Sequence, residues 1–287
     1  MYVRMLFLFP FFGVRFVTQS REVMKWSKRS FTIFWVVHSW HGILKNTLLR
    51  RENIMKLTSM DTIKNLKWAL RKQIKARIAK LSHDTLLKQS ILAAKTISDL
   101  PEFKNAKTVG LYMNLPSGEL PTDEIVKTCF NFDKKVYLPR VTAISRFNDT
   151  KRFEKQKSIL HFLSIDNLSE ARSLPERGRY KIREPEFKSD DSGSVVNDLL
   201  QNNEKLDILF VPGMAFSSDC ERLGHGAGYY DDFIKRYNEK YHEKPLLIGL
   251  GLKEQLLTKE NGEVLHMEEH DELLDNVVIA DTVYSRR

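Results

Sequence analysis

Cysteine is scarce in this sequence of 287 residues, which contains only Cys129 and Cys220. Two cysteines alone imply no disulfide framework, and a reducing compartment is the simpler environment for the chain. Cys220 also has no partner pattern for metal binding or nucleophilic catalysis. Repeats and low-complexity segments are absent as well, and the share of hydrophobic residues, 42%, is typical of a globular protein.

Long hydrophobic runs are also missing. The apolar run over 5–12 is broken by Pro10, and the run over 31–44 is interrupted by His38 and His41. Neither reaches the roughly 18 uninterrupted apolar residues that a membrane-spanning helix needs. We therefore expect no membrane span.

Acidic residues are rare at the N-terminus. Residues 1–60 hold ten Lys or Arg and two acids, so they carry +8 of the formal net charge of +9. A nucleic-acid-binding domain should keep its positive charge on the folded body, so this function is disfavoured. The basic segment predicts a mitochondrial transit peptide, whereas a mis-assigned start before Met55 or Met60 would favour a cytoplasmic protein. In either case we expect a leader over 1–58 and a catalytic domain over 59–287.

Beyond the leader, apolar spacing predicts helices that alternate with strands. Alternation of this kind favours a mainly parallel sheet covered on both faces, with ligands bound beyond the carboxyl ends of the strands. The segment over 144–203 is less regular and predicts loops, short strands and a surface insertion. The expected helices cover 63–81, 83–100, 121–130, 229–237 and 253–257, and the expected strands cover 109–113, 136–138, 208–211, 246–252 and 277–280.

A glycine-rich run between a predicted strand and a predicted helix is the most specific feature. Gly224, Gly226 and Gly228 alternate, so their backbone N–H groups can approach an anion closely. Arg222 can donate to phosphate oxygens, and Asp231 can share a Mg²⁺ ion with them. The spacing fits neither the Rossmann nor the Walker pattern, and alone it is equally consistent with a structural turn. The flanking Arg, Tyr and Asp residues favour a phosphate site.

Those residues also carry a resemblance. The runs Val211–Phe216 and Arg222–Asp231 resemble the motif of the 5-formyltetrahydrofolate cyclo-ligase family, also called 5,10-methenyltetrahydrofolate synthetases. The similarity extends from about residue 62 to residue 282. Further segments agree in order, namely Lys67–Arg71, Glu119–Thr122, Leu138–Arg140, Ile182–Pro185, Leu250–Gln255 and His270–Asp271.

The resemblance implies a three-layer α/β/α fold like that of sugar-phosphate isomerases and CoA transferases. It also implies ATP- and Mg²⁺-dependent conversion of 5-formyltetrahydrofolate, with or without a polyglutamate tail, to 5,10-methenyltetrahydrofolate, ADP and phosphate. In that reaction the formyl oxygen is phosphorylated and N10 closes the ring. Because no enzyme nucleophile is required, positioning and charge neutralisation must supply most of the rate. We expect a monomer whose partner is the small-molecule substrate.

The resemblance also implies roles for individual residues. Arg222 and Asp231 would act in catalysis, and Asp231 and Asp271 would bind Mg²⁺. The nucleotide would contact Lys67, Arg71, Arg222, Leu223, Gly224, His225, Gly226, Ala227, Gly228, Tyr229 and Tyr230. The folate would contact Met113, Glu119, His225, Gly226, Ala227, Gly228 and Tyr229.

Structural explanations remain open for several of these residues. Lys67 and Arg71 lie four residues apart and could form the solvated side of a helix. Met113 could be a core residue, Glu119 a surface loop acid, and Asp271 part of a solvated acidic group.

Two other functions remain open. Another phosphate-using isomerase or transferase could have this fold, but it would leave the full run from Arg222 to Asp231 unexplained. A binding module without catalysis is the second. Ala227 keeps it open, because many relatives have Lys or Gly there, and the Ala227 Cβ limits positive φ.

Overall fold

The computed structural model describes residues 62–146, 151–152, 154, 156–258, 263–268 and 271–286. Residues 60–287 form one compact unit. The predicted leader over 1–58 therefore lies outside the described residues, as does His270 of the predicted His-Asp pair. Within the described part of the chain, no helix combines the length and the apolar character needed to cross a membrane.

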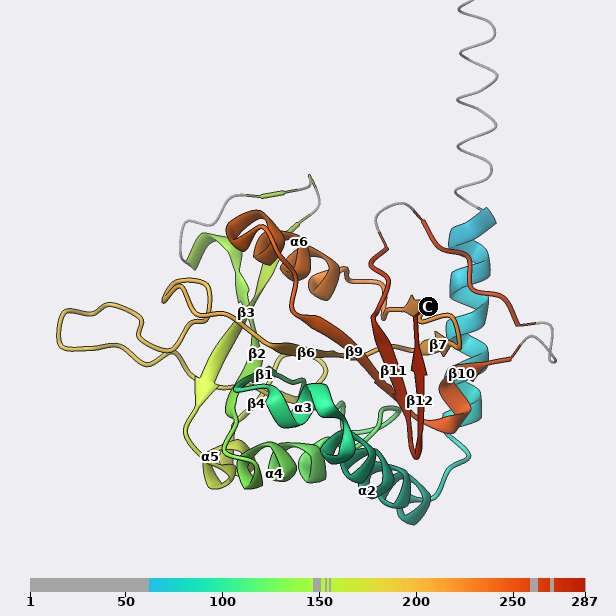
Figure 1. Cartoon of the computed structure of the whole chain (residues 1–287). Coiled ribbons are helices and arrows are strands. Elements are labelled where there is room, and N and C mark those ends of the chain that lie inside the picture. Colours follow the sequence, from blue (N-terminus) through green and yellow to red (C-terminus); the bar gives the residue numbers. More distant parts are fainter. Residues whose placement is uncertain are drawn as a thin grey trace, which may run out of the picture. The chain divides into compact units, whose positions relative to one another are not determined.

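A seven-stranded sheet forms the centre of this unit, in the order β12-β11-β9-β6-β1-β2-β3 (Figure 1). The five inner strands are parallel, and each edge strand is antiparallel to its neighbour. The mainly parallel sheet predicted from the sequence is thus confirmed. The strands are β1 (Thr108–Gly110), β2 (Lys135–Ala143), β3 (Ser158–Ile165), β6 (Ile208–Val211), β9 (Leu246–Gly251), β11 (Asn276–Ile279) and β12 (Thr282–Ser285).

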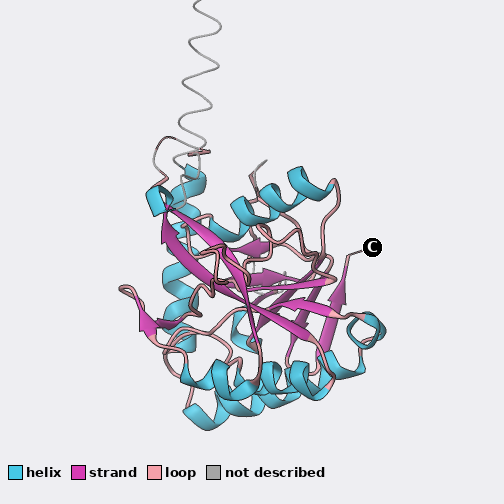
Figure 2. Ribbon diagram, turned by 90° about the vertical axis from the view of Figure 1, so that its left-hand side faces the viewer, coloured by secondary structure: helices cyan, strands magenta, loops and turns pink. Residues whose placement is uncertain are grey.

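Helices cover both faces of the sheet, which confirms the three-layer architecture (Figures 1 and 2). The helix α6 (Tyr229–Tyr241) lies on one face. The opposite face carries α2 (His83–Asp99), α3 (Pro101–Asn105), α4 (Asp123–Asn131) and α5 (Leu168–Ser173). A further helix covers residues 62–78.

Apolar spacing explains how these helices pack. Phe233, Ile234 and Tyr237 of α6 are buried together in one core cluster, because residues three and four apart share a helix face. Ile74 and Ile78 place the helix over 62–78 in the other cluster by the same spacing. All four residues of β6 are buried, as expected for a central strand covered on both faces.

The segment over 144–203 differs from the prediction of loops and short strands. It contains β3, an eight-residue strand paired along its length with β2. The other side of β3 is occupied by the segment that precedes β6: Ser164 N donates to Asn197 O at 2.8 Å, and Leu199 N donates to Phe162 O at 2.9 Å. The rest of the segment contains the 3-10 turn η1 (Ile144–Arg146), α5, and the hairpin of β4 (Glu176–Arg177) and β5 (Ile182–Arg183).

A small three-stranded sheet follows the carboxyl ends of β6 and β9. It consists of β7 (Ala215–Ser217), β8 (Arg222–Leu223) and β10 (Leu256–Leu257). The helix predicted over 253–257 is one 3-10 turn, η2 (Lys253–Gln255), which leads directly into β10. Because β8 joins α6 through the glycine-rich run, this small sheet fixes where that run begins.

Candidate active site

The glycine-rich loop between β8 and α6 uses backbone geometry that favours glycine. Gly226 and Gly228 have φ values of 100° and 70°, which side chains disfavour. At Gly224 the restriction is space, because a Cβ would lie 2.9 Å from Arg222 Nη1. Ala227 is not among the described residues with positive φ. The Cβ of Ala227 therefore causes no backbone strain from positive φ, which the sequence analysis had considered.

Arg222 lies under this loop and is 7% exposed. Its Nη2 donates to Asp231 Oδ1, and its Nη1 donates to Pro212 O at 3.3 Å. Its Nε is buried without a hydrogen-bond partner. Buried donors in native proteins are nearly always satisfied, so the unpaired Nε indicates that an acceptor belongs beside it.

Two cations from the helix over 62–78 reach the same region. Lys67 Nζ lies 2.6 Å from Asp271 Oδ2 and 2.7 Å from Glu268 Oε2. Arg71 Nε donates to Gly224 O at 2.8 Å. Burial acts to lower the pKa of Lys67, but the bonds to both carboxylates raise this pKa overall. Burial lowers the pKa of Arg71, whose guanidinium nevertheless stays charged.

Glu119 faces the loop from the segment after β1. Its Oε1 lies 2.8 Å from His225 Nε2, and its Oε2 accepts from Leu115 N at 2.7 Å. Burial and the Glu119 carboxylate both raise the pKa values of Tyr112 and Tyr230. The two phenols therefore stay protonated near this carboxylate at neutral pH.

Met113 does not join this group through any polar contact. It is 3% exposed and packs in the core cluster that includes residues of α2 and α4. Its burial favours the core role over the folate contact that the resemblance implied.

Three residues in this region were not predicted as site residues. Ser158 Oγ lies 2.7 Å from Tyr229 OH, which ties the start of β3 to the loop. Glu268 shares the ammonium of Lys67 with Asp271. Gln255 Nε2 donates to Gly213 O at 2.6 Å. This bond supports the Pro-Gly turn after β6, in which Pro212 O accepts a hydrogen bond from Arg222. These contacts join segments far apart in sequence, and no spacing rule reveals them.

The two carboxylates predicted to bind Mg²⁺ are present, each bound to a cation. Among the described residues, no three His, Cys, Asp or Glu side chains converge in a way that could hold a metal. Mg²⁺ is usually held by one or two carboxylates together with substrate phosphates and water. The donor set of Asp231 and Asp271 fits that arrangement and not a cage made by the protein alone.

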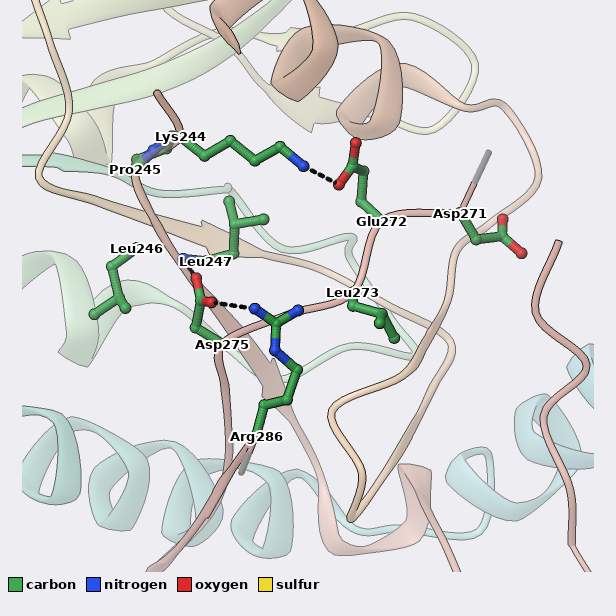
Figure 3. A pocket seen from close by; sticks show the side chains of 9 residues that line it. All are labelled: Lys244, Pro245, Leu246, Leu247, Asp271, Glu272, Leu273, Asp275 and Arg286. Atoms are coloured by element: carbon green, nitrogen blue, oxygen red, sulfur yellow. Dashed lines mark hydrogen bonds and ion pairs between the residues drawn. The ribbon is translucent and has the colours of Figure 1, made fainter. Parts of the chain in front are cut away.

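A separate hollow of about 610 Å³ lies at the amino ends of β9 and β11. Figure 3 shows two ion pairs in it, Lys244 with Glu272 and Arg286 with Asp275. Asp271 is the one predicted site residue on its wall, and its carboxylate points away from both pairs (Figure 3). The hollow therefore shares only Asp271 with the predicted site residues.

Known proteins resemble the chain over most of its length. The family model described as the 5-formyltetrahydrofolate cyclo-ligase family matches residues 63–280. The 5-formyltetrahydrofolate cyclo-ligase of Saccharomyces cerevisiae is 35% identical over 75% of this chain and 95% of its own length. A relative from Arabidopsis thaliana, described as a mitochondrial 5-formyltetrahydrofolate cyclo-ligase, is 29% identical over 76% of each chain.

A solved structure resembles the fold as well. The 5,10-methenyltetrahydrofolate synthetase of Aquifex aeolicus matches with a TM-score of 0.55 and 26% identity. The match covers 77% of this chain and 93% of that protein.

Proposed function

The chain belongs to the 5-formyltetrahydrofolate cyclo-ligase family, and we propose that it converts 5-formyltetrahydrofolate to 5,10-methenyltetrahydrofolate with consumption of ATP in the presence of Mg²⁺. Family membership confirms the resemblance seen in the sequence and the assignment to the ligases. It favours the cyclo-ligase over an isomerase or transferase of the same fold. ATP, Mg²⁺ and the residue roles are the proposed part.

The observation that carries the nucleotide part is the set of cations around the glycine-rich loop. Arg222, Arg71 and Lys67 all contact this loop or the carboxylates beside it. The N-terminus of α6, capped by Gly228, adds about half a positive charge at the same place. The unpaired Arg222 Nε would gain its missing acceptor from a phosphate oxygen.

The folate part rests on Glu119 and its neighbours: Glu119 Oε1 lies 2.8 Å from His225 Nε2, and burial and the Glu119 carboxylate both raise the pKa of Tyr230. An ionised Glu119 carboxylate only accepts hydrogen bonds, so it is suited to the N–H donors of a pterin ring. Tyr229 is held by Ser158 and would give the loop an aromatic surface.

The chain's own residues would orient the reactants and neutralise charge. When bound, Mg²⁺-ATP would supply the phosphoryl group that turns the formyl oxygen into a leaving group, so that N10 closes the ring and phosphate departs. Arg222 would hold phosphate oxygens through its fork of donors, while Asp231 and Asp271 would face the metal. No side chain need form a covalent bond, since positioning and electrostatic stabilisation can supply the rate enhancement.

An absorbance assay with the full chain tests this function. We expect 5-formyltetrahydrofolate to give the near-ultraviolet absorbance of the methenyl product with Mg²⁺-ATP. The signal should be missing without ATP or with excess chelator. Binding of folate and nucleotide without product would instead support the inactive binding module, and product formation without ATP would contradict the proposed chemistry.

A further inference from the structure

Glu268 is the acidic residue near the proposed site to which neither the sequence pattern nor the comparisons assign a role. Its side chain is 16% exposed, and Lys67 Nζ lies between its Oε2 and the Oδ2 of Asp271. The backbone N of Glu268 also donates a hydrogen bond to Asp271 Oδ2 at 2.8 Å. One ammonium is therefore shared by two carboxylates that the local chain holds together, and the group keeps a net negative charge.

A second ion pair lies at the glycine-rich run. Arg222, proposed to bind phosphate, is bonded to Asp231, proposed to bind the metal. Two of the proposed phosphate-binding cations, Lys67 and Arg222, are thus paired with carboxylates, whereas Arg71 donates to the backbone carbonyl of Gly224. A nucleotide that arrives alone has to compete with these carboxylates, because its phosphates and the carboxylates repel each other.

We propose that Glu268 is a positioning residue that holds Lys67 in a resting ion pair, and that Mg²⁺ and the nucleotide release Lys67 together. This inference rests on the proposed function. The metal would occupy Asp271 while the phosphates occupy Lys67, so the two ligands would favour each other's binding. Glu268 would keep Lys67 from the phosphates when no metal is present.

A direct consequence concerns nucleotide affinity without metal. Removing the charge of Glu268 weakens the hold on Lys67 and removes one repulsive charge, so metal-free nucleotide should bind more tightly than to the wild type. A merely structural role for Glu268 would give unchanged or weaker binding.

Glu272 provides a matched control. It follows Asp271 directly and bears the same charge, but its carboxylate is paired with Lys244, at 2.6 Å, on the wall of the separate hollow (Figure 3). Glu272→Gln therefore removes an equal charge nearby without freeing Lys67.

Calorimetric titration of the full chain with ADP, in chelator and in excess Mg²⁺, tests the inference. For Glu268→Gln we expect affinity in chelator to rise at least about threefold, with a smaller change in Mg²⁺, while Glu272→Gln stays near the wild type. Unchanged or weaker metal-free binding in Glu268→Gln, or an equal gain in Glu272→Gln, would overturn the proposal.

Failure of the proposed function would look different. A wild type that turns over folate with Mg²⁺-ATP, combined with an unresponsive Glu268→Gln, rejects only the resting pair. A wild type that binds no nucleotide in either condition rejects the nucleotide site and the resting pair together.

Discussion

At the scale of single residues, the shape of the Arg222 side chain should matter as much as its charge. Replacement by Lys keeps the charge but removes the fork that reaches both Asp231 and Pro212. We expect Arg222→Lys to lower kcat by about 100- to 1,000-fold, the usual loss when one electrostatic donor is removed from an active site.

The pair of Arg236 and Asp232 on α6 supplies the control for this variant. Its Nε–Oδ2 distance is 3.1 Å, and neither residue is assigned to the proposed site. Arg236→Lys should keep kcat within a few-fold of the wild type. Equal losses in both variants would show that the effect does not depend on the contacts of Arg222 in the proposed site.

A second residue-scale prediction concerns pH. Asp207 Oδ2 accepts hydrogen bonds from Lys107 N at 2.7 Å and Thr108 N at 2.9 Å, which joins the starts of β6 and β1. Burial acts to raise the pKa of Asp207, but these hydrogen bonds outweigh it and lower the pKa below the ordinary value of 3.8. The ionised form therefore stabilises the fold above that value and loses this effect as pH falls through the lowered pKa.

Asp207→Asn should accordingly be less stable than the wild type at pH 7, with a difference that shrinks below pH 3.8. Urea denaturation at several pH values measures this difference. Asp166→Asn is the comparison, because the Asp166 side chain is 75% exposed. A destabilisation by Asp207→Asn that stays constant down to pH 3 would contradict the assigned cause.

Site residues could be predicted from the sequence where they lie close together along the chain. Arg222, Asp231 and the glycines lie within ten residues, so their joint presence was visible in the sequence. Neither the bond between Lys67 and Glu268 nor the contact between Tyr229 and Ser158 has such a pattern, because each joins residues more than 70 positions apart.

At the scale of elements, η2 supports the turn beneath the site through one side chain. Gln255 is 1% exposed, accepts from Leu252 N at 2.8 Å and donates to Gly213 O at 2.6 Å. Gln255→Leu would leave both backbone groups buried without these partners. We expect a loss of about 1–3 kcal/mol in the free energy of unfolding.

Chemical denaturation measures this loss, with Gln73→Leu as the control. Gln73 is exposed and has a single long bond, 3.3 Å, to Glu263. Its replacement should change stability by less than about 0.5 kcal/mol, as is usual for surface positions. Similar values for the two variants would indicate that the bonds of Gln255 do not stabilise the turn.

Elements with strong periodicity were predicted well, and those that depend on tertiary pairing were not. The helix predicted over 229–237 is α6, which continues to Tyr241 before His242 ends it with positive φ. β3 was missed because apolar and polar residues do not strictly alternate from Ser158 to Ile165. The strand is buried by its pairing with β2 on one side and by the segment over 197–199 on the other. β12, which follows β11 after a two-residue turn, was also not predicted. It is only four residues long.

At the scale of the whole molecule, the basic segment before the described residues leads to a prediction about the location of the protein. Because residues 1–60 carry +8 and hold only two acids, a transit peptide over 1–58 that directs import into mitochondria stays a prediction. The full chain fused to a fluorescent protein should localise to mitochondria, and a version that starts at Met60 should remain in the cytosol. Identical distributions would reject the transit peptide.

The cover on β3 has a consequence for how copies of this molecule can meet. Backbone groups on an open sheet edge can recruit a strand from a neighbouring molecule. Where the segment over 197–199 lies against β3, the N–H groups of Ser164 and Leu199 are already engaged within the chain. Self-association at this border would therefore have to use side-chain surfaces, since a second molecule could extend the sheet there only by first peeling that segment away.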